Sequence, residues 1–313
     1  MRRAASILAV GLTIGCAQGS PPDLEKQPPS DDSGMGPVPE GYTRFVTTPR
    51  KLAPGEEVML NEWVTAPEEA DVDIVDVKGE VATTLHHFVL YSVTTAEEVG
   101  TVRPWQETDQ LTLGLRMAGA FGKEALGSYH FPPDVVLRVS AGRSLMANVH
   151  YINASTEPVT GHAWIDVKLA KPSPNAKVAG MVTSLDTTLS LPPHAQSSYD
   201  VTCVVAEDIG LIAWANHMHE LGSAVDTELV RADGTKVDVR RDPTWSPEWV
   251  FDPPFSTWPV ESPLLLRAGD TLHTRCTWNN TEAGAVAFPR EMCLGFGFFI
   301  GPKDLTCLAG KWL

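Results

Sequence analysis

Residues 136–153 read VLRVSAGRSLMANVHYIN, and residues 265–280 read LLRAGDTLHTRCTWNN. Each stretch has a glycine turn followed by a run in which apolar and polar residues alternate, which is the pattern of a half-buried β-strand. Alignment on the glycines pairs similar residues: Gly142 with Gly269, Leu145 with Leu272, Tyr151 with Trp278, and Asn153 with Asn280. The chain is therefore predicted to contain two copies of one β-rich unit.

The rest of the chain after residue 43 also has a sequence pattern typical of β-strands. Short runs rich in valine, threonine and aromatic residues recur at Asp71–Val77, Thr83–Val93, Val135–Val139, Ser144–Ile152 and His162–Leu169. Turn sequences separate these runs, and few windows keep a helical period, although residues 97–117 contain either a short helix or a long loop. We expect an all-β protein with one β-sandwich over residues 44–173 and another over residues 174–313.

The charge of the chain argues against one class of partner. The 313 residues include 24 Lys and Arg against 39 Asp and Glu, which gives a formal net charge of −15. Nucleic-acid phosphates are bound by cationic side chains. Binding of nucleic acid is therefore not expected.

The N-terminus has the pattern of an export signal, with two arginines before an apolar run too short to span a bilayer. The sequence LTIGC, which ends at Cys16, resembles a bacterial lipoprotein cleavage site. It predicts a signal peptide over residues 1–15 and a lipid on Cys16, with plain secretion as the alternative. Residues 16–43, rich in Pro, Ser and acidic residues, are expected to form a disordered tether. The protein would then be exported and lipid-anchored to the bacterial cell envelope, on its periplasmic or outer-membrane face.

Four further cysteines lie in the C-terminal part of the chain, at Cys203, Cys276, Cys293 and Cys307. An even number of cysteines in an exported protein predicts disulfides, and four cysteines allow three pairings. None of them has the close CxxC spacing of a zinc site.

Two histidines with one residue between them, His217 and His219, occur in the segment WANHMHELG at residues 214–222. On a strand, side chains with this spacing project from one face, so both imidazoles can reach one metal ion. The alternative is a pair of hydrogen-bonded polar residues at the end of a strand.

A second group of histidines comprises the adjacent pair His86 and His87 together with His150. Neighbours on a regular strand point to opposite faces, so His86 and His87 can reach one metal only if the backbone bends or different ring nitrogens are used. His150 lies on the face of its strand opposite the apolar residues. Three imidazoles suit Cu, Zn, Fe or Ni. The alternative for His150 is an ordinary surface histidine. The separation between His87 and His150 is similar to the separation between His219 and Thr277. This similarity suggests that each copy of the unit carries its own histidine strand.

The second group lacks a third histidine, because Thr277 stands where the first copy has His150. Met292, near the start of the last long apolar run, offers a thioether, and this soft donor selects copper over zinc. A methionine that fills the core is the alternative.

The ordered set of His-His, Val-His-Tyr, His-x-His and Glu-Met-Cys resembles the copper type II, ascorbate-dependent monooxygenases, the family of peptidylglycine α-hydroxylating monooxygenase and dopamine β-hydroxylase. The resemblance covers the chain from about residue 44 to its C-terminus. It implies two tandem antiparallel jelly-roll sandwiches, each with one copper ion. It also implies disulfides between Cys276 and Cys293 and between Cys203 and Cys307.

The same resemblance assigns roles to the donors. His86, His87 and His150 would hold an electron-storage copper, whereas His217, His219 and Met292 would hold the copper that binds O2. Ascorbate would reduce both ions, and the product would be a hydroxylated small organic substrate together with water. The competing functions are a non-catalytic copper-binding lipoprotein with the same donors, and a β-sandwich adhesin or scaffold with accidental histidines.

Family members that amidate peptides hold the substrate carboxylate with an arginine, an asparagine and a tyrosine. The corresponding positions here are Ala215, Leu294 and Phe296, all of them apolar. We therefore expect no amidation of glycine-extended peptides.

Two other features near the ligands have open interpretations. The tryptophan- and proline-rich stretch at residues 242–258 either walls a substrate pocket or packs in the core. Glu220 and Glu291 either orient an imidazole or are solvated surface acids.

Overall fold

The computed structural model describes residues 36–80, 84–106, 109–122, 131–250, 253–288 and 290–312. Within these residues Val38–Leu313 forms one compact unit, and the fold is all-β as predicted. The helical elements are single turns, α1 (Asp109–Thr112) and η1 (Pro247–Val250). No helix in the described part of the chain is long and apolar enough to cross a membrane. The signal peptide, Cys16 and most of the predicted tether lie outside the described residues.

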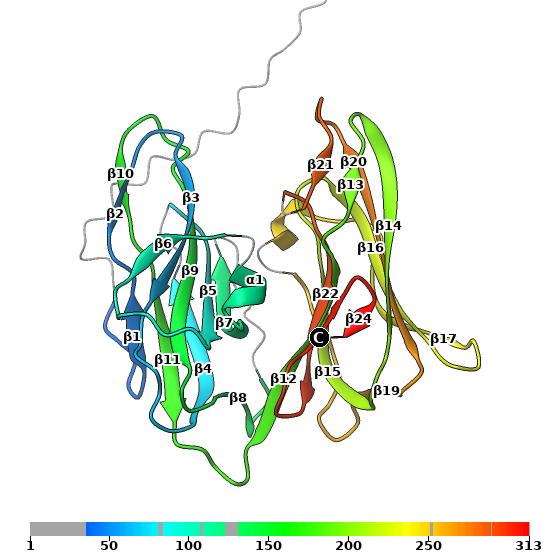
Figure 1. The fold of residues 1–313 in the computed structure, drawn as a ribbon, viewed down its shortest axis with the longest axis horizontal. Helices are drawn as coiled ribbons and strands as arrows, with labels where there is room; N and C mark the ends of the chain where they lie inside the picture. The colour runs from blue at the N-terminus through cyan, green and yellow to red at the C-terminus, as the bar shows by residue number, and fades with distance from the viewer. Residues whose placement is uncertain are drawn as a thin grey trace, which may run out of the picture. The chain divides into compact units, whose positions relative to one another are not determined.

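A five-stranded sheet forms in the N-terminal half (Figure 1). Its strands, in spatial order, are β6 (Val102–Pro104), β3 (Glu57–Trp63), β9 (Ser144–Ile152), β5 (Leu85–Val93) and β7 (Arg116–Gly122). β9 occupies the range predicted for the first repeat strand, and its apolar face is buried as the alternation requires.

A four-stranded sheet forms in the C-terminal half from β14 (Ala195–Val204), β20 (Thr271–Asn280), β16 (Gly222–Val230) and β17 (Lys236–Asp242). The second repeat strand, β20, lies between β14 and β16, just as β9 lies between β3 and β5 (Figure 1).

The largest sheet has eleven strands. Its main path runs through β1 (Thr43–Val46), β11 (Trp164–Ala170), β4 (Val72–Glu80), β8 (Val135–Val139), β12 (Lys177–Asp186), β22 (Cys293–Ile300), β15 (Ile209–His217) and β18 (Ser256–Thr257). The strands off this path are β19 (Leu264–Leu266), β23 (Leu305–Leu308) and β24 (Lys311–Trp312). Two small ribbons complete the fold, β10 (Val159–Gly161) with β2 (Arg50–Leu52), and β13 (Ser190–Leu191) with β21 (Val286–Ala287).

The repeat extends to the hydrogen bonds that end each repeat strand. The side-chain amide nitrogen Nδ2 of Asn153 donates to the carbonyls of Leu52, Ala53 and Glu157. The side-chain amide nitrogen Nδ2 of Asn280 donates to the carbonyls of Leu191, Pro192 and Gly284. Each asparagine is almost fully buried and ties its strand to two loops. The same device therefore closes both copies, which explains why this residue type recurs at that point of the repeat.

Each half of the chain has a strand that carries predicted histidine ligands, but the two strands do not occupy equivalent places in the repeat. His87 pairs with His150 across β5 and β9, and the equivalent partner of Thr277 on β16 is Ala224. His217 instead ends β15, which belongs to the eleven-stranded sheet. The duplicated strands are thus a shared scaffold on which the two histidine groups occupy different sheets.

Two large apolar clusters and a small third one, formed by Trp63, Val93, Leu113 and Met146, make up the core of the described residues. The first gathers residues mainly from the N-terminal half, among them Phe88 and Val149, and the second gathers residues of the C-terminal half, among them Trp214 and Trp278. This arrangement is consistent with β-sandwich packing. The jelly-roll connections, the number of sandwiches and the boundaries at residues 44–173 and 174–313 stay predictions.

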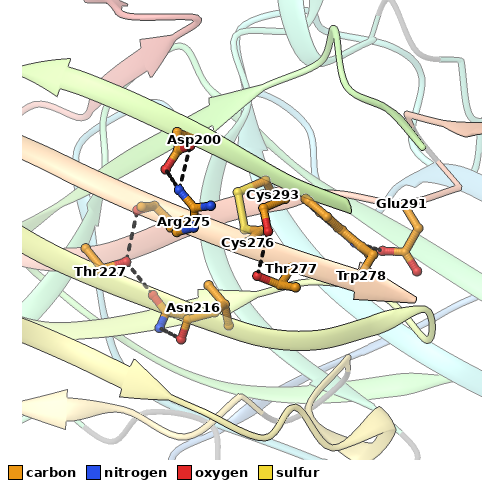
Figure 2. The surroundings of a disulfide bond; sticks show 12 residues. Asp200, Asn216, Thr227, Arg275, Cys276, Thr277, Trp278, Glu291 and Cys293 are labelled. Carbon is orange, nitrogen blue, oxygen red and sulfur yellow. Dashed lines mark hydrogen bonds and ion pairs between the residues drawn. A yellow bond between two sulfur atoms is a disulfide. The ribbon is translucent and has the colours of Figure 1, made fainter. Parts of the chain in front are cut away.

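Both expected disulfides are present. Cys203 on β14 is bonded to Cys307 on β23, and Cys276 on β20 is bonded to Cys293 on β22. All four cysteines are buried. The second bond (Figure 2) joins the four-stranded sheet to the eleven-stranded sheet. Its Cys293 directly follows Met292 in the sequence.

Candidate metal centre

The first pair of predicted ligands lies where β15 ends. His217 is the last residue of the strand, and a tight turn follows, in which the amide of Gly222 donates to the carbonyl of His219 at 3.1 Å. The ring centroids of His217 and His219 are 5.1 Å apart, and the rings meet edge to face. The structure therefore brings the two imidazoles together, as the spacing predicted.

The ring of His219 has a defined orientation. Its Nδ1 lies 2.9 Å from the carbonyl oxygen of Arg290. A carbonyl can only accept a hydrogen bond, so Nδ1 carries the proton and Nε2 holds the lone pair of the neutral ring. A histidine whose other nitrogen donates to a carbonyl is the usual form of a metal ligand.

His217 is held in its neutral form by its surroundings. Burial lowers its pKa well below 6.5, and the positive charges of protonated His219 and His87 would lower it further. A metal binds the unprotonated nitrogen of an imidazole, so a histidine kept neutral is prepared for this role.

Met292 immediately precedes β22 and is partly exposed. Across the β15–β22 ladder His217 is the direct partner of Leu294. If the alternation of β22 continues back by two residues, Met292 lies on the same face as Leu294 and is a diagonal neighbour of His217. Diagonal neighbours in an antiparallel pair are about 7–8 Å apart, within reach of a long side chain. Met292 as the third ligand stays a prediction, which this register favours.

The other predicted set lies on the five-stranded sheet. The rings of His87 and His150, which are cross-strand partners, have centroids 5.3 Å apart. The ladder between β5 and β9 is irregular between Leu85 and His87. Such a bulge at His86 is the kind of backbone bend that two adjacent histidines need in order to reach one metal. The side chain of His86 lies outside the described part of the chain, so its role stays a prediction.

His150 is far less exposed than a surface histidine, since only 12% of its side chain is accessible. Its Nε2 lies 2.9 Å from a carboxylate oxygen of Glu57, and its pKa is lowered by burial, which outweighs the opposing effect of Glu57. In the neutral ring Nε2 therefore donates to Glu57, and Nδ1 is the lone-pair nitrogen. His87 in turn contacts Asn148, which lies on the same face of β9 as His150.

The donor chemistry fits copper in part. Among the described residues, His, Cys, Asp and Glu side chains form no group of three that could hold a metal ion. One predicted set contains His86, whose side chain is not described, and the other takes its third donor from a methionine. Two imidazoles with a thioether as the third donor would suit copper better than zinc. The copper count and both complete donor sets stay predictions.

Several contacts of the site were not expected from the sequence. Glu291 is fully buried rather than a solvated acid, and it accepts hydrogen bonds from the backbone of His219 and from the indole of Trp278 (Figure 2). Glu220 is exposed and forms an ion pair with Arg290. The only sequence signal for the role of Glu291 was its position beside Met292.

The tryptophan-rich stretch belongs to the core more than to a pocket. Trp245 is 5% exposed and belongs to the second apolar cluster, and Trp249 and Trp258 pack against that cluster. A cavity of about 460 Å³ lies instead in the N-terminal half, beside Arg50 and Glu62. None of the predicted ligands lines it.

Comparison with known protein families gives a match that covers part of the chain. Residues 175–306 match the model of the copper type II ascorbate-dependent monooxygenase C-terminal domain. No curated protein matches the chain. The match includes His217, His219, Met292 and the cysteines Cys203, Cys276 and Cys293.

Two solved structures are weakly similar. One is infectious bursal disease virus of the Gx strain, with 8% identity, 83% of this chain and 72% of that chain covered, and a TM-score of 0.20. The other is a variant oxalate decarboxylase from Bacillus subtilis, with 8% identity, coverages of 83% and 70%, and a TM-score of 0.14. Scores this low do not establish a shared fold. The match over residues 175–306 supports the resemblance to the copper type II, ascorbate-dependent monooxygenases over the C-terminal half of the chain.

Proposed function

We propose that this protein is a copper-dependent monooxygenase that hydroxylates a C–H bond of a small organic substrate with O2 and ascorbate or another one-electron reductant. The observation that carries the proposal is the pairing of His217 with Leu294, which favours a position for Met292 beside the two imidazoles of a matched monooxygenase domain. The overall reaction consumes O2, two electrons and two protons, and it yields a hydroxylated substrate and water.

The residues of the C-terminal half would bind and orient the ion. His217 is neutral because it is buried, and His219 presents its Nε2 because its Nδ1 donates to Arg290. Met292 would add a soft donor that stabilises Cu(I). Bound copper would supply electron transfer and O2 activation. His86, His87 and His150 would hold a second ion, which accepts electrons from the reductant.

The first test is ascorbate-dependent O2 uptake by purified, copper-loaded protein across a panel of small organic substrates. We expect uptake that His217→Ala removes, because this change deletes a predicted ligand. His273→Ala is the matched control, since His273 is a histidine of the same half that binds Asp200 and Glu228 and has no predicted metal role. Tight copper binding without O2 chemistry would favour the non-catalytic copper-binding alternative instead. Protein free of copper after production with copper would favour the scaffold alternative.

The face of β22 that follows Met292 suggests the polarity of the substrate. Leu294 and Phe296 are partly exposed, and the rings of Phe296 and Phe255 meet edge to face at 5.6 Å. Opposite Phe296 on β15 is Ala215, which is fully buried. No side chain at these positions can pair with a carboxylate, so an apolar, uncharged substrate fits better than a peptide C-terminus.

We therefore predict that the protein does not amidate glycine-extended peptides. Incubation of the copper-loaded enzyme with such a peptide, ascorbate and O2 should give no hydroxyglycine or amide product by mass spectrometry. An uncharged aromatic or aliphatic substrate in the same assay is the positive arm. Turnover of the peptide would contradict the prediction.

We also propose that the protein is exported and held in the bacterial cell envelope by a lipid on Cys16, with no other membrane contact. The LTIGC sequence supports this proposal. Metabolic labelling with a fatty acid should label the wild type and not Cys16→Ser, and a soluble, unlabelled wild type would contradict it.

A further inference from the structure

Glu291 carries a buried carboxylate with an unusual set of partners. The residue is 0% exposed. Its Oε2 accepts from the backbone amide of His219 at 3.0 Å and from the indole Nε1 of Trp278 at 2.9 Å, and its Oε1 accepts from the amide of Leu221 at 2.7 Å. All three partners are N–H donors. The side chain therefore acts only as an acceptor, which is the hydrogen-bonding capacity of an ionised carboxylate.

These contacts fix the turn that follows His217. Two of the three donors are amides of that turn, and the third comes from β20, on the four-stranded sheet (Figure 2). The turn is also tightly packed around Gly222. A β-carbon added to Gly222 would lie 2.9 Å from the ring of Trp245 and 3.1 Å from the carbonyl oxygen of His219.

The residue before Glu291 fixes the ring of the same histidine. The carbonyl of Arg290 accepts from Nδ1 of His219 at 2.9 Å. Two consecutive residues thus hold His219, one through its backbone and the other through its imidazole. Met292, the predicted third ligand, comes next in the chain.

We propose that Glu291 is a positioning residue for the copper site, which holds the backbone of His219 so that its Nε2 faces the position occupied by the metal. The inference rests on the proposed function in that it takes His219 to be a copper ligand. Glu291 touches neither substrate nor metal in this role. It acts through His219, and it links that histidine to Trp278 in the core.

The chemistry of the site requires a carboxylate at this position. Glutamine has nearly the same shape, but it replaces one acceptor oxygen with an NH2 group. In the site of Glu291 that group would face an N–H donor, whichever way the amide turned. At least one buried N–H would lose its partner, and the turn would no longer be held from both sides.

The test compares Glu291→Gln with Glu62→Gln. Glu62 is a matched control because it is also a buried acid, 5% exposed, and accepts from the amide and hydroxyl of Thr48 in the other half of the chain. Cu(I) affinity is measured at each site by competition with a chelator. For the His219 site the measurement is made in a His150→Ala background, which removes a donor of the other predicted site. We expect Glu291→Gln to weaken that site on the order of 10–100-fold, the range for residues that orient metal ligands. Glu62→Gln should lower only the melting temperature.

A second measurement does not involve metal. In metal-free protein, nitrogen NMR of the histidine rings should show the Nδ1–H form of His219 in the wild type and a mixture of tautomers in Glu291→Gln, with faster exchange of the His219 and Leu221 amides. A purely structural role predicts a lower melting temperature with unchanged copper affinity and an unchanged tautomer, and that result would overturn the proposal.

Two further outcomes are also decisive. If Glu291→Gln does not fold, Trp278→Phe removes one donor only, and we expect a smaller loss of copper affinity at the same site. Unchanged affinity in that variant would contradict the proposal. If the wild type binds no copper at His217 and His219, the proposed function fails, whereas the metal-free NMR comparison still decides whether Glu291 orients His219.

Discussion

Replacement of Met292 by alanine is expected to lower the copper content from two ions per chain to one and to abolish ascorbate-driven O2 uptake. The pairing of His217 with Leu294 favours a position for Met292 beside His217, so the change would delete the thioether of one site only. Two imidazoles would remain there, with weaker affinity for Cu(I) because the soft donor is gone. Elemental analysis after dialysis against a weak chelator measures the loss.

The converse variant separates the two sites. His150→Ala removes a donor from the five-stranded sheet and should also leave one copper ion per chain, but at His217 and His219. The double variant should bind none. Met181→Ala is the control for Met292→Ala, because Met181 is a partly buried methionine that packs on the first apolar cluster and has no predicted metal role. Loss of both ions from either single variant would show that the sites are not separate, contrary to the prediction.

The parts of the fold that were predictable depend on local patterns. The alternation in residues 144–152 gave β9 with the correct bounds, and a glycine turn precedes each repeat strand, with positive φ at Gly142 and Gly269. In residues 97–117 the structure contains the single turn α1, in agreement with the short-helix alternative, but also the strand β6 and the start of β7, which the pattern did not predict. The disulfide pairing was correct because it came with the family resemblance. Spacing alone left three pairings open.

The parts that were not predictable depend on contacts between distant residues. The sequence left open whether Glu291 is a solvated acid or orients an imidazole, because its partner His219 is 72 positions away. The bulge between Leu85 and His87 appears only when β5 is paired with β9. The sheet to which each histidine strand belongs, β5 or β15, could not be inferred from similar separations along the chain. Burial and register are set by tertiary pairing, which a single sequence does not contain.

The two disulfides are expected to differ in what they stabilise. Cys203 and Cys307 are separated by 104 positions, whereas Cys276 and Cys293 are separated by 17. In the chain-entropy account a cross-link that closes about 100 residues contributes about 4.7 kcal/mol, against about 3 kcal/mol for about 15 residues. Paired replacement of Cys203 and Cys307 by alanine should therefore cause the larger loss in free energy of unfolding, measured by denaturant titration of metal-free protein.

Copper affinity should show the opposite order. Cys293 is adjacent to Met292, and its partner Cys276 lies two residues from Trp278, the indole of which donates to Glu291. Paired replacement of Cys276 and Cys293 by alanine should therefore weaken the His217 and His219 site by more than replacement of Cys203 and Cys307, although it costs less stability. Each pair of variants is the control for the other, because both remove one buried disulfide from the same half. If stability and copper affinity fall in the same order, the shorter disulfide has no particular role in holding the metal site.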